Sequence, residues 1–147
     1  MITFDPIGVV RSPFATIDQV PKGLGAKHST EGALVLRPEL EAGLTDIEGF
    51  SHLYVIWVFD RIQGYELMSR ARADGKPHGV FATRFPRRPN LLGISVVRLV
   101  SRDGNLLHFI GADMLDGTPL LDIKPYIPEF DVFDVEKSGW YERRAYR

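Results

Sequence analysis

Three arginines in a proline-rich segment are the first residues whose types suggest a binding function. They lie in Thr83–Asn90, with the sequence TRFPRRPN, as Arg84, Arg87 and Arg88. Because proline fixes φ and lacks an amide hydrogen, the segment is predicted to be an ordered, non-helical loop. Guanidinium groups on such a loop could hold a carboxylate or a phosphate through paired hydrogen bonds. A surface loop with solvated arginines would explain the same residues, so the pattern alone leaves both interpretations open.

A second polar segment, Asp113–Tyr126 (DMLDGTPLLDIKPY), follows an apolar stretch of the chain. Its residues Asp116–Pro119 are typical of a tight turn, which is the simplest explanation for them. The segment also holds Asp113, Asp122 and Lys124, and ionised groups beside a core are costly unless they are paired or used. The spacing of the aspartates matches no EF-hand loop and no set of histidines accompanies them, so we expect no metal.

These two segments predict a working site built from two loops, Arg84–Asn90 and Asp116–Tyr126. Other motifs are weaker. The four histidines have no spacing typical of a zinc site or a catalytic triad, and each is interpreted as structural or as a surface residue. The run Lys22–Gly25 lacks the strand and helix that flank a phosphate-binding loop. Trp140 and Tyr141 are predicted to anchor the C-terminus by packing.

The elements that must position these segments are predicted to be short strands. Ten prolines and fourteen glycines separate short apolar runs, which is typical of a β-rich domain. The strand at Leu53–Phe59 is apolar on both faces at its centre and polar at its ends, a pattern that suits a closed barrel. The other predicted strands are Ile7–Val10, Ala33–Leu36, Gly79–Arg84, Gly93–Val100 and Leu106–Ala112.

Two hairpins are expected among these strands. The last two strands are predicted to pair through the turn Ser101–Asn105, in which aspartate precedes glycine. The strand Gly79–Arg84 is expected to pair with Leu67–Ala71 across Asp74 and Gly75, although a helix over Tyr65–Arg72 is the alternative.

The predicted fold class is therefore mainly β: a single-domain antiparallel β-barrel with short helical segments, extending over residues 1–147. A proline start, early acidic residues and a glycine end predict one helical turn at Glu39–Gly43. A chain of 147 residues fits one domain of ordinary size.

Composition excludes several classes of function. The chain has no cysteine, which excludes a disulfide framework and thiolate catalysis. Eighteen basic and nineteen acidic residues give a net charge of −1, so any nucleic-acid contact must depend on a local patch such as the three arginines above. No apolar run approaches the roughly 20 residues of a membrane helix. The first residues lack the layout of a secretory signal, and we expect a cytoplasmic protein without a membrane partner.

Five motifs taken together resemble the TsaA-like (YaeB, TrmO) family. They follow one another in the family's order over nearly the whole chain, and the last two are long and specific. They are Pro6–Phe14, Gly49–Leu53, Gly79–Arg84, Arg88–Asn90, and Asp116–Pro119 continued through Asp122–Tyr126. The resemblance implies a small β-barrel protein that forms homodimers and binds S-adenosylmethionine. It also implies methylation of N6 of threonylcarbamoyl-adenosine in the anticodon loop of tRNA.

The resemblance further implies a set of cofactor contacts. The implied cofactor-binding positions are Pro21, Lys22, Gly23, Asp60, Arg61, Arg84, Gly93, Ile94, Asp116, Gly117, Thr118 and Pro119. Three residues depart from the family's pattern. Lys22-Gly23 stands in place of arginine-glutamine, Asp60 in place of histidine, and Leu91 in place of proline. The first two departures touch the expected cofactor pocket.

Methyl transfer from a sulfonium needs alignment more than a protein nucleophile. A urea-like acceptor nitrogen is a poor nucleophile, so a base would help, and Asp60 or Asp122 is predicted to supply it. The predicted substrate-binding residues are Arg87, Arg88, Asn90, Lys124 and Tyr126, which would contact RNA phosphates and a splayed-out base. Two other hypotheses remain open: a sensor that binds S-adenosylmethionine without catalysis, and a methyltransferase that acts on a small molecule.

Overall fold

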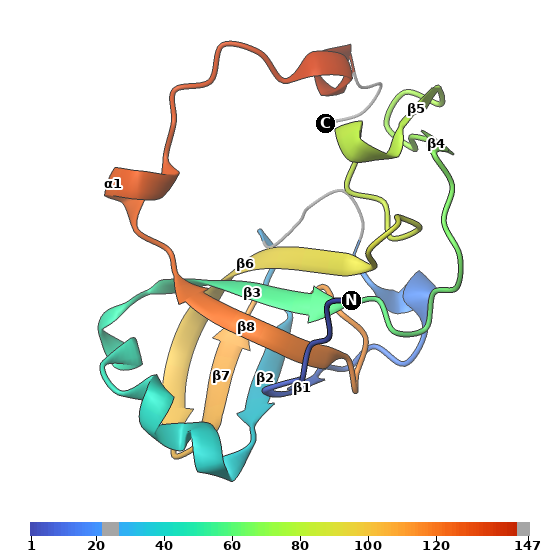
Figure 1. Ribbon diagram of the computed structural model, residues 1–147. Coiled ribbons are helices and arrows are strands. Elements are labelled where there is room, and N and C mark those ends of the chain that lie inside the picture. The colour runs from blue at the N-terminus through green and yellow to red at the C-terminus, as the bar shows by residue number, and fades with distance from the viewer. Residues whose placement is uncertain (22–26, 144–147) are drawn as a thin grey trace.

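Six antiparallel strands form a closed barrel in the computed structural model, which describes residues 1–21 and 27–143 (Figure 1). Around the barrel the strand order is β1-β2-β7-β6-β3-β8. The strands are β1 Gly8–Arg11, β2 Glu31–Leu36, β3 His52–Val58, β6 Leu92–Asp103, β7 Leu106–Ile110 and β8 Pro119–Pro125. The predicted fold class is thereby confirmed: the protein is mainly β, with an antiparallel barrel and short helical segments.

Strand β3 pairs with β6 over its whole length and with β8 along its other edge. Its side chains alternate, and Leu53, Val55 and Trp57 point into the interior. Side chains fill that interior, as expected for a barrel of this size. The largest fully buried ones in the barrel are Phe109, Leu34, Leu53, Leu107, Met114, Leu120, Val10, Val55 and Val97, with Thr118 as the polar member.

Strand β8 was not predicted, and the interpretation of Asp116–Tyr126 as a loop is wrong. Residues Pro119–Pro125 close the barrel between β1 and β3, where Val9 lies opposite Pro119 and Trp57 opposite Leu120. A proline at each end of the strand and two charged residues within it hide the strand pattern. These charged residues fit the strand because Asp122 and Lys124 face outward while Leu120 is buried.

The second sheet is a small hairpin of β4 Met68–Arg70 and β5 Pro77–Gly79. The predicted hairpin turn at Asp74 and Gly75 is present, with Gly75 at a φ of 70°, but the strand that pairs with Met68–Arg70 is Pro77–Gly79. The alternative helix is wrong. The predicted strand Gly79–Arg84 is also wrong. A 3₁₀ turn, η4 Val80–Ala82, replaces it, because the Thr83 hydroxyl donates a hydrogen bond of 2.8 Å to the carbonyl oxygen of Val80.

The hairpin of β6 and β7 is confirmed, but its turn is shorter than predicted. Asp103 lies opposite Leu106, so only Gly104 and Asn105 form the turn, with Gly104 at a φ of 64°. The long β6 also carries a bulge between Leu99 and Ser101. Beyond β7 the chain leaves the sheet at Gly111, before the predicted end of the strand.

Short helices connect the strands. The predicted helical turn lies within η2 Pro38–Leu44. The other short helices are η1 Ile17–Gln19, η3 Ile47–Gly49, α1 Pro128–Asp131 and η5 Gly139–Arg143. In the described part of the chain, no helix has the length and apolar character needed to span a bilayer.

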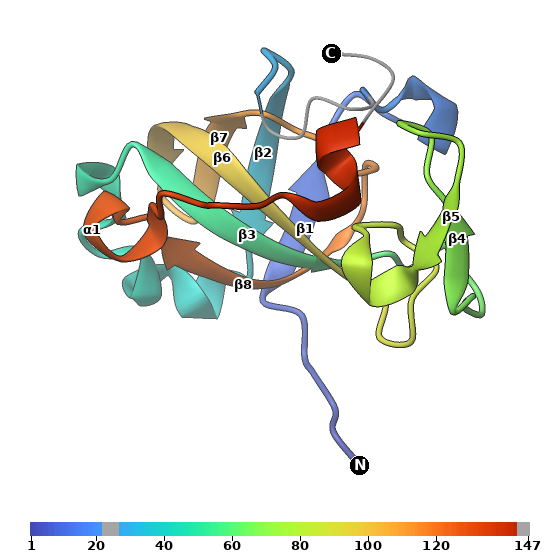
Figure 2. The same cartoon turned by 90° about the horizontal axis from the view of Figure 1, so that it is seen from above.

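The C-terminal segment returns from α1 to the β4–β5 hairpin (Figures 1 and 2). Trp140 stacks on His78 with the ring centroids 4.3 Å apart and the planes 12° from parallel. Its indole N–H donates a hydrogen bond of 2.7 Å to the carbonyl oxygen of Ala82. Trp140 therefore anchors the C-terminal segment, as predicted.

Candidate functional site

The predicted site segments gather at one end of the barrel, here called the mouth, where β1, β3 and β7 end and β2, β6 and β8 begin. The strand pairing requires this arrangement, because Val58 at the end of β3 lies opposite Leu92 at the start of β6. In the same way, Val9 near the end of β1 lies opposite Pro119. The mouth segments are Asp60-Arg61, Arg84–Asn90 and Asp116–Pro119.

The turn before β8 is fixed by backbone hydrogen bonds to β1. The amide of Gly117, at a φ of 84°, donates to the carbonyl oxygen of Val10 over 2.8 Å, and the amide of Val10 donates to the carbonyl oxygen of Thr118 over 2.8 Å. Thr118 is 2% exposed, and its hydroxyl donates a bond of 2.7 Å to the carbonyl oxygen of Leu115. The turn is therefore a rigid part of the barrel.

The carboxylate of Asp116 is held by the chain just after β1. Its Oδ1 accepts a hydrogen bond of 3.1 Å from the amide of Ser12, and its Oδ2 lies 3.9 Å from a guanidinium nitrogen of Arg11. About half of each side chain is exposed, so this ion pair contributes little stability by itself. It fixes the direction of the Asp116 carboxylate at the rim of the mouth.

Arg61 brings two of the predicted positions together. Its Nη2 donates a hydrogen bond of 2.8 Å to the carbonyl oxygen of Asp116 and lies 3.4 Å from the hydroxyl of Thr118. Its Nε lies 3.4 Å from Oδ1 of Asp60. Arg61 thus joins the end of β3 to the turn before β8.

The three arginines of the 84–90 loop have different surroundings. Nη1 of Arg88 donates to the carbonyl oxygens of Thr83 and Phe85, each over 3.0 Å, so Arg88 shapes its own loop. Nη1 of Arg87 donates to the carbonyl oxygen of Gln63 over 3.0 Å. The exposed Arg84 has no hydrogen bond or ion pair with the residues that the structure describes. Its guanidinium is therefore available to bind an anion.

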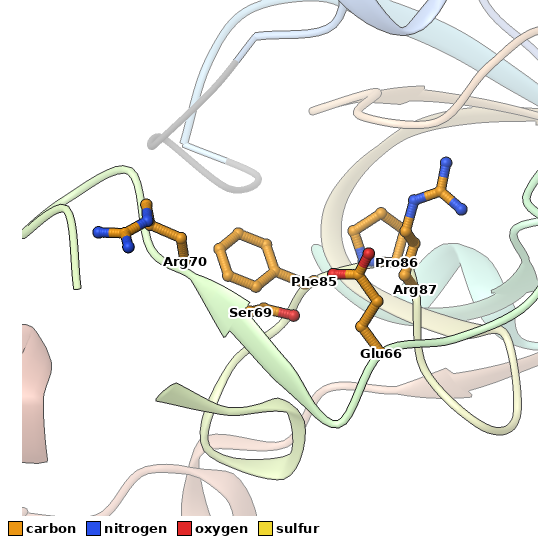
Figure 3. Close-up of a pocket in the computed structure, with 6 residues that line it drawn as sticks. All are labelled: Glu66, Ser69, Arg70, Phe85, Pro86 and Arg87. Carbon is orange, nitrogen blue, oxygen red and sulfur yellow. The ribbon is translucent and has the colours of Figure 1, made fainter. Parts of the chain in front are cut away.

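An open hollow lies between this loop and β4. Figure 3 shows the ring of Phe85 between Arg70 on one side and Glu66, Pro86 and Arg87 on the other. Ser69 completes the lining. The sequence did not indicate Glu66, Ser69 or Arg70, because the hollow depends on where the β4–β5 hairpin lies.

The predicted cofactor-binding residues Gly93 and Ile94 lie on opposite faces of β6. A Cβ atom at Gly93 would lie 2.5 Å from Cε2 of Trp57, so the indole rests directly on the backbone there. Ile94 is 59% exposed on the outer wall. Only the backbone of these two residues could serve a ligand at the mouth.

A buried polar chain below the mouth was missed. The indole N–H of Trp57 donates to the hydroxyl of Ser95 over 3.0 Å, and that hydroxyl donates to Oδ1 of Asp113 over 2.6 Å. Burial raises the pKa of Asp113, against the opposing effects of the hydrogen bond from Ser95 and of the charge on His28. The sequence indicated Asp113 only as an ionised group whose burial beside the core costs free energy. No local pattern marks its partners, since they lie 18 and 56 positions away in the sequence.

The remaining predicted residues are not all at the mouth. Asp122 lies on the outer wall opposite Ile56, with its carboxylate 4.0 Å from Nζ of Lys124. Tyr126 follows β8 and packs against Tyr54, with ring centroids 5.4 Å apart. The structure therefore separates the two predicted bases, since only Asp60 lies beside Arg61.

Pro21 is the last residue before the gap in the described chain, and Lys22 and Gly23 lie outside the described residues. Within the described ranges, no group of three or more histidines, aspartates or glutamates could hold a metal ion.

Comparisons with known proteins identify relatives of the chain. The family model described as the tRNA-methyltransferase O N-terminal domain matches residues 9–132. A probable S-adenosyl-L-methionine-binding protein of Pyrococcus abyssi is 48% identical over 147 residues, with 100% of this chain and 80% of that protein covered. A human tRNA (adenine(37)-N6)-methyltransferase is 33% identical over 134 residues, which cover 86% of this chain and 30% of that protein.

A solved structure shares the fold. The crystal structure of TrmO from Pseudomonas aeruginosa superimposes with a TM-score of 0.78 and 34% identity. The match covers 95% of this chain and 62% of that chain, so this protein spans less than two thirds of its structural relative. The barrel, the order of its motifs and the matched family model together show that the chain belongs to the tRNA-methyltransferase O N-terminal domain family.

Proposed function

We propose that the protein is an S-adenosylmethionine-dependent methyltransferase that methylates N6 of an adenosine in tRNA. The proposed acceptor is threonylcarbamoyl-adenosine in the anticodon loop, and the proposed location is the cytoplasm. The observation that carries the proposal is the joining of Arg61 to the Asp116–Thr118 turn at the barrel mouth. The printed names of the archaeal and human relatives support the cofactor and the reaction.

The residues at the mouth suit the methyl donor. That molecule supplies an activated methyl group on a sulfonium, together with an amino-acid carboxylate and an adenine. The exposed guanidinium of Arg84 could hold the carboxylate bidentately. Backbone groups of the turn, held rigid by Arg61, would set the position of the ligand. The proposed donor-binding residues are Pro21, Lys22, Gly23, Asp60, Arg61, Arg84, Gly93, Ile94, Asp116, Gly117, Thr118 and Pro119.

The transfer forms an N–C bond as the S–C bond breaks, and the acceptor nitrogen loses a proton. Asp60 is the base that we favour, because it lies at the mouth beside Arg61. Asp122 remains the second candidate, although its carboxylate is on the outer wall. A base on the wall could act only if the acceptor or a second subunit reached it.

The acceptor side is proposed to be the 84–90 loop. Arg87 and Asn90 are exposed there, and Arg88 would hold the loop in shape through its bonds to carbonyl oxygens. Lys124, near the end of β8, and Tyr126, just after it, lie at the end of the barrel away from the mouth and would contact a separate stretch of tRNA phosphates. With a net charge of −1, the protein would depend on this local patch.

A homodimer is part of the proposal. Leu92 and Ile94 are exposed on the outer wall of β6, and the segment after α1 exposes Phe130, Phe133 and Val135. Phe133 is 76% exposed, an unusual position for a large apolar side chain. A second copy would cover these groups. Sedimentation should show a dimer, and Phe133→Asp should shift it toward monomer; a monomeric wild type would reject this part.

One incubation tests the reaction. The purified protein is mixed with S-adenosylmethionine carrying a labelled methyl group and with tRNA from cells that lack this gene, and the tRNA is digested to nucleosides. Label in threonylcarbamoyl-adenosine is the expected result. Binding of the methyl donor without transfer would favour a sensor, and transfer to a small molecule alone would favour the third hypothesis.

The base is tested separately. Asp60→Asn should slow methyl transfer more than it weakens the binding of S-adenosylhomocysteine, and Asp122→Asn serves as the comparison. Wild-type rates in both variants would exclude both residues as the base.

A further inference from the structure

Two polar side chains below the mouth have no role in the reaction described above. His28 precedes β2, and Asp113 follows β7. The two segments are joined because the carbonyl oxygen of Thr30 accepts hydrogen bonds from the amides of Gly111 and Ala112, over 2.8 and 3.1 Å. The chain before His28 is the stretch that holds the expected cofactor residues Lys22 and Gly23.

The ring of His28 has a hydrogen-bonding group without a partner. Its Nδ1 accepts a bond of 3.3 Å from the amide of Thr30, so in the neutral ring the hydrogen is on Nε2. Nε2 is buried and has no hydrogen-bond partner among the described residues. A buried donor without a partner is costly, so an acceptor atom of a ligand would relieve that cost.

Asp113 supplies the opposite polarity. Its Oδ1 accepts from Ser95, while a carboxylate offers about four acceptor sites, so capacity remains for a ligand. The chain from Trp57 fixes the direction of these bonds, because the Ser95 oxygen accepts from the indole and must donate its own hydrogen to Asp113. The two side chains are near enough for His28 to affect the pKa of Asp113.

We propose that His28 and Asp113 form a subsite that binds the edge of an adenine ring. Asp113 accepts the hydrogen of the exocyclic N6, and Nε2–H of His28 donates to the neighbouring ring nitrogen. An adenine edge presents a donor beside an acceptor, which matches this pair. A 6-oxo purine presents an acceptor in place of N6–H and would face the carboxylate unfavourably. The rings of Trp57 and Phe59, with centroids 4.3 Å apart, supply apolar surface beside the subsite.

This proposal rests on the proposed function, which brings two adenines to the mouth: that of the methyl donor and that of the tRNA acceptor. The shared chemistry is the adenine edge, and the experiment must separate the two sources. For the adenine of the methyl donor, calorimetry compares the affinities for S-adenosylhomocysteine and S-inosylhomocysteine. For the acceptor, fluorescence anisotropy compares anticodon stem-loops with adenosine or inosine at the target position.

Asp113→Asn is the decisive variant. Because Ser95 donates toward residue 113, the amide oxygen should face Ser95 and the amide nitrogen should face the ligand. Wild type should bind the adenine form about tenfold or more tightly than the inosine form, and Asp113→Asn should reverse or abolish that preference. Asp103→Asn, at the far end of the barrel, is the matched control and should keep the wild-type preference.

His28 is tested by a conservative pair of variants. His28→Gln keeps a donor and should retain most of the affinity for the adenine form, whereas His28→Phe should lose about tenfold. Melting curves show which variants are folded.

Each outcome decides the proposal. A reversed or abolished preference with the homocysteine compounds supports the subsite and assigns it to the methyl donor. A reversed or abolished preference with the stem-loops supports it and assigns it to the acceptor. An unchanged preference in folded Asp113→Asn, with both ligand pairs, overturns the subsite alone. A wild type that binds neither S-adenosylhomocysteine nor the stem-loops overturns the proposed function as well.

Discussion

The guanidinium of Arg61 donates a hydrogen bond of 2.8 Å to the carbonyl oxygen of Asp116, across 55 positions of sequence. This bond joins the end of β3 to the turn that begins β8, and it holds the rim of the mouth in one shape. The same nitrogen lies 3.4 Å from the hydroxyl of the buried Thr118. A change at Arg61 should therefore alter the mouth without disturbing the core.

Arg61→Ala should weaken the binding of S-adenosylhomocysteine about tenfold, because a charged hydrogen bond that orders the turn is lost. Isothermal titration calorimetry measures the effect. Arg37→Ala is the matched control, since the Arg37 side chain is 44% exposed against 43% for Arg61 and lies at the opposite end of the barrel. Equal affinities in the two variants would remove Arg61 from the proposed site.

Thr118→Val should lower the free energy of unfolding by about 1–3 kcal/mol, because the carbonyl oxygen of Leu115 loses the shorter of its two hydrogen bonds and keeps only the 3.2 Å bond from the backbone amide of residue 118. Thr45→Val removes the same kind of bond, from a hydroxyl to the carbonyl oxygen three residues earlier, at an exposed position. Its effect should be close to zero. Urea denaturation of both variants makes the comparison, and equal losses would show that burial of the bond is unimportant.

Gly93→Ala should destabilise the barrel by about 1–3 kcal/mol, because the new methyl group would force the indole of Trp57 away from the backbone. The displaced ring would also lose its bond to Ser95, so tryptophan fluorescence should change with stability. At Gly79 a Cβ would meet nothing within 4 Å, and Gly79→Ala is the control. A Gly93→Ala protein with wild-type stability and fluorescence would contradict the observed packing.

Asp113 should make stability depend on pH. Burial raises the pKa of Asp113 in the folded protein above that of the unfolded chain, so between the two values the folded protein holds more protons. Stability is then lost as pH rises from the ordinary carboxyl range through the raised pKa. Asp113→Asn cannot titrate and escapes this loss.

The stability of Asp113→Asn relative to wild type should therefore increase with pH across that window and level off above it. Chemical denaturation at a series of pH values measures the difference. Asp103→Asn, at an exposed position, is the control. A constant difference between Asp113→Asn and wild type would mean that Asp113 titrates normally.

Local patterns predicted the parts of the fold that depend on neighbouring residues. The strand β3 could be found because its apolar residues run continuously, and the Asp103-Gly104 turn because glycine adopts a positive φ. Strand β8 was not predicted, because it has a proline at each end, outward-facing charged residues and only one fully buried leucine. The segment Val80–Ala82 forms a 3₁₀ turn where a strand was expected, and the hydroxyl of Thr83 stabilises that turn through a hydrogen bond to the carbonyl oxygen of Val80.

Some parts of the candidate site could likewise be predicted from the sequence, and others could not. The Asp-Gly-Thr-Pro turn and the arginine loop were visible as motifs in the sequence. The chain from Trp57 through Ser95 to Asp113 was not, because it depends on the length of β6 beyond the end of β7 and on the direction of each side chain. The binding roles of the residues at the mouth stay predictions until the experiments above are done.

The closure between β1 and β8 has a consequence for biosynthesis. The first strand of the chain meets the last strand of the barrel at Gly8 with Leu120 and at Val9 with Pro119. A growing polypeptide cannot complete this ring until β8 has left the ribosome, so β1 must wait with an open edge while most of the domain is made. The mouth takes shape only at that moment. Ligand binding would then report that synthesis and folding of the barrel are complete, and a nascent chain released before β8 should be a target for chaperones and proteases.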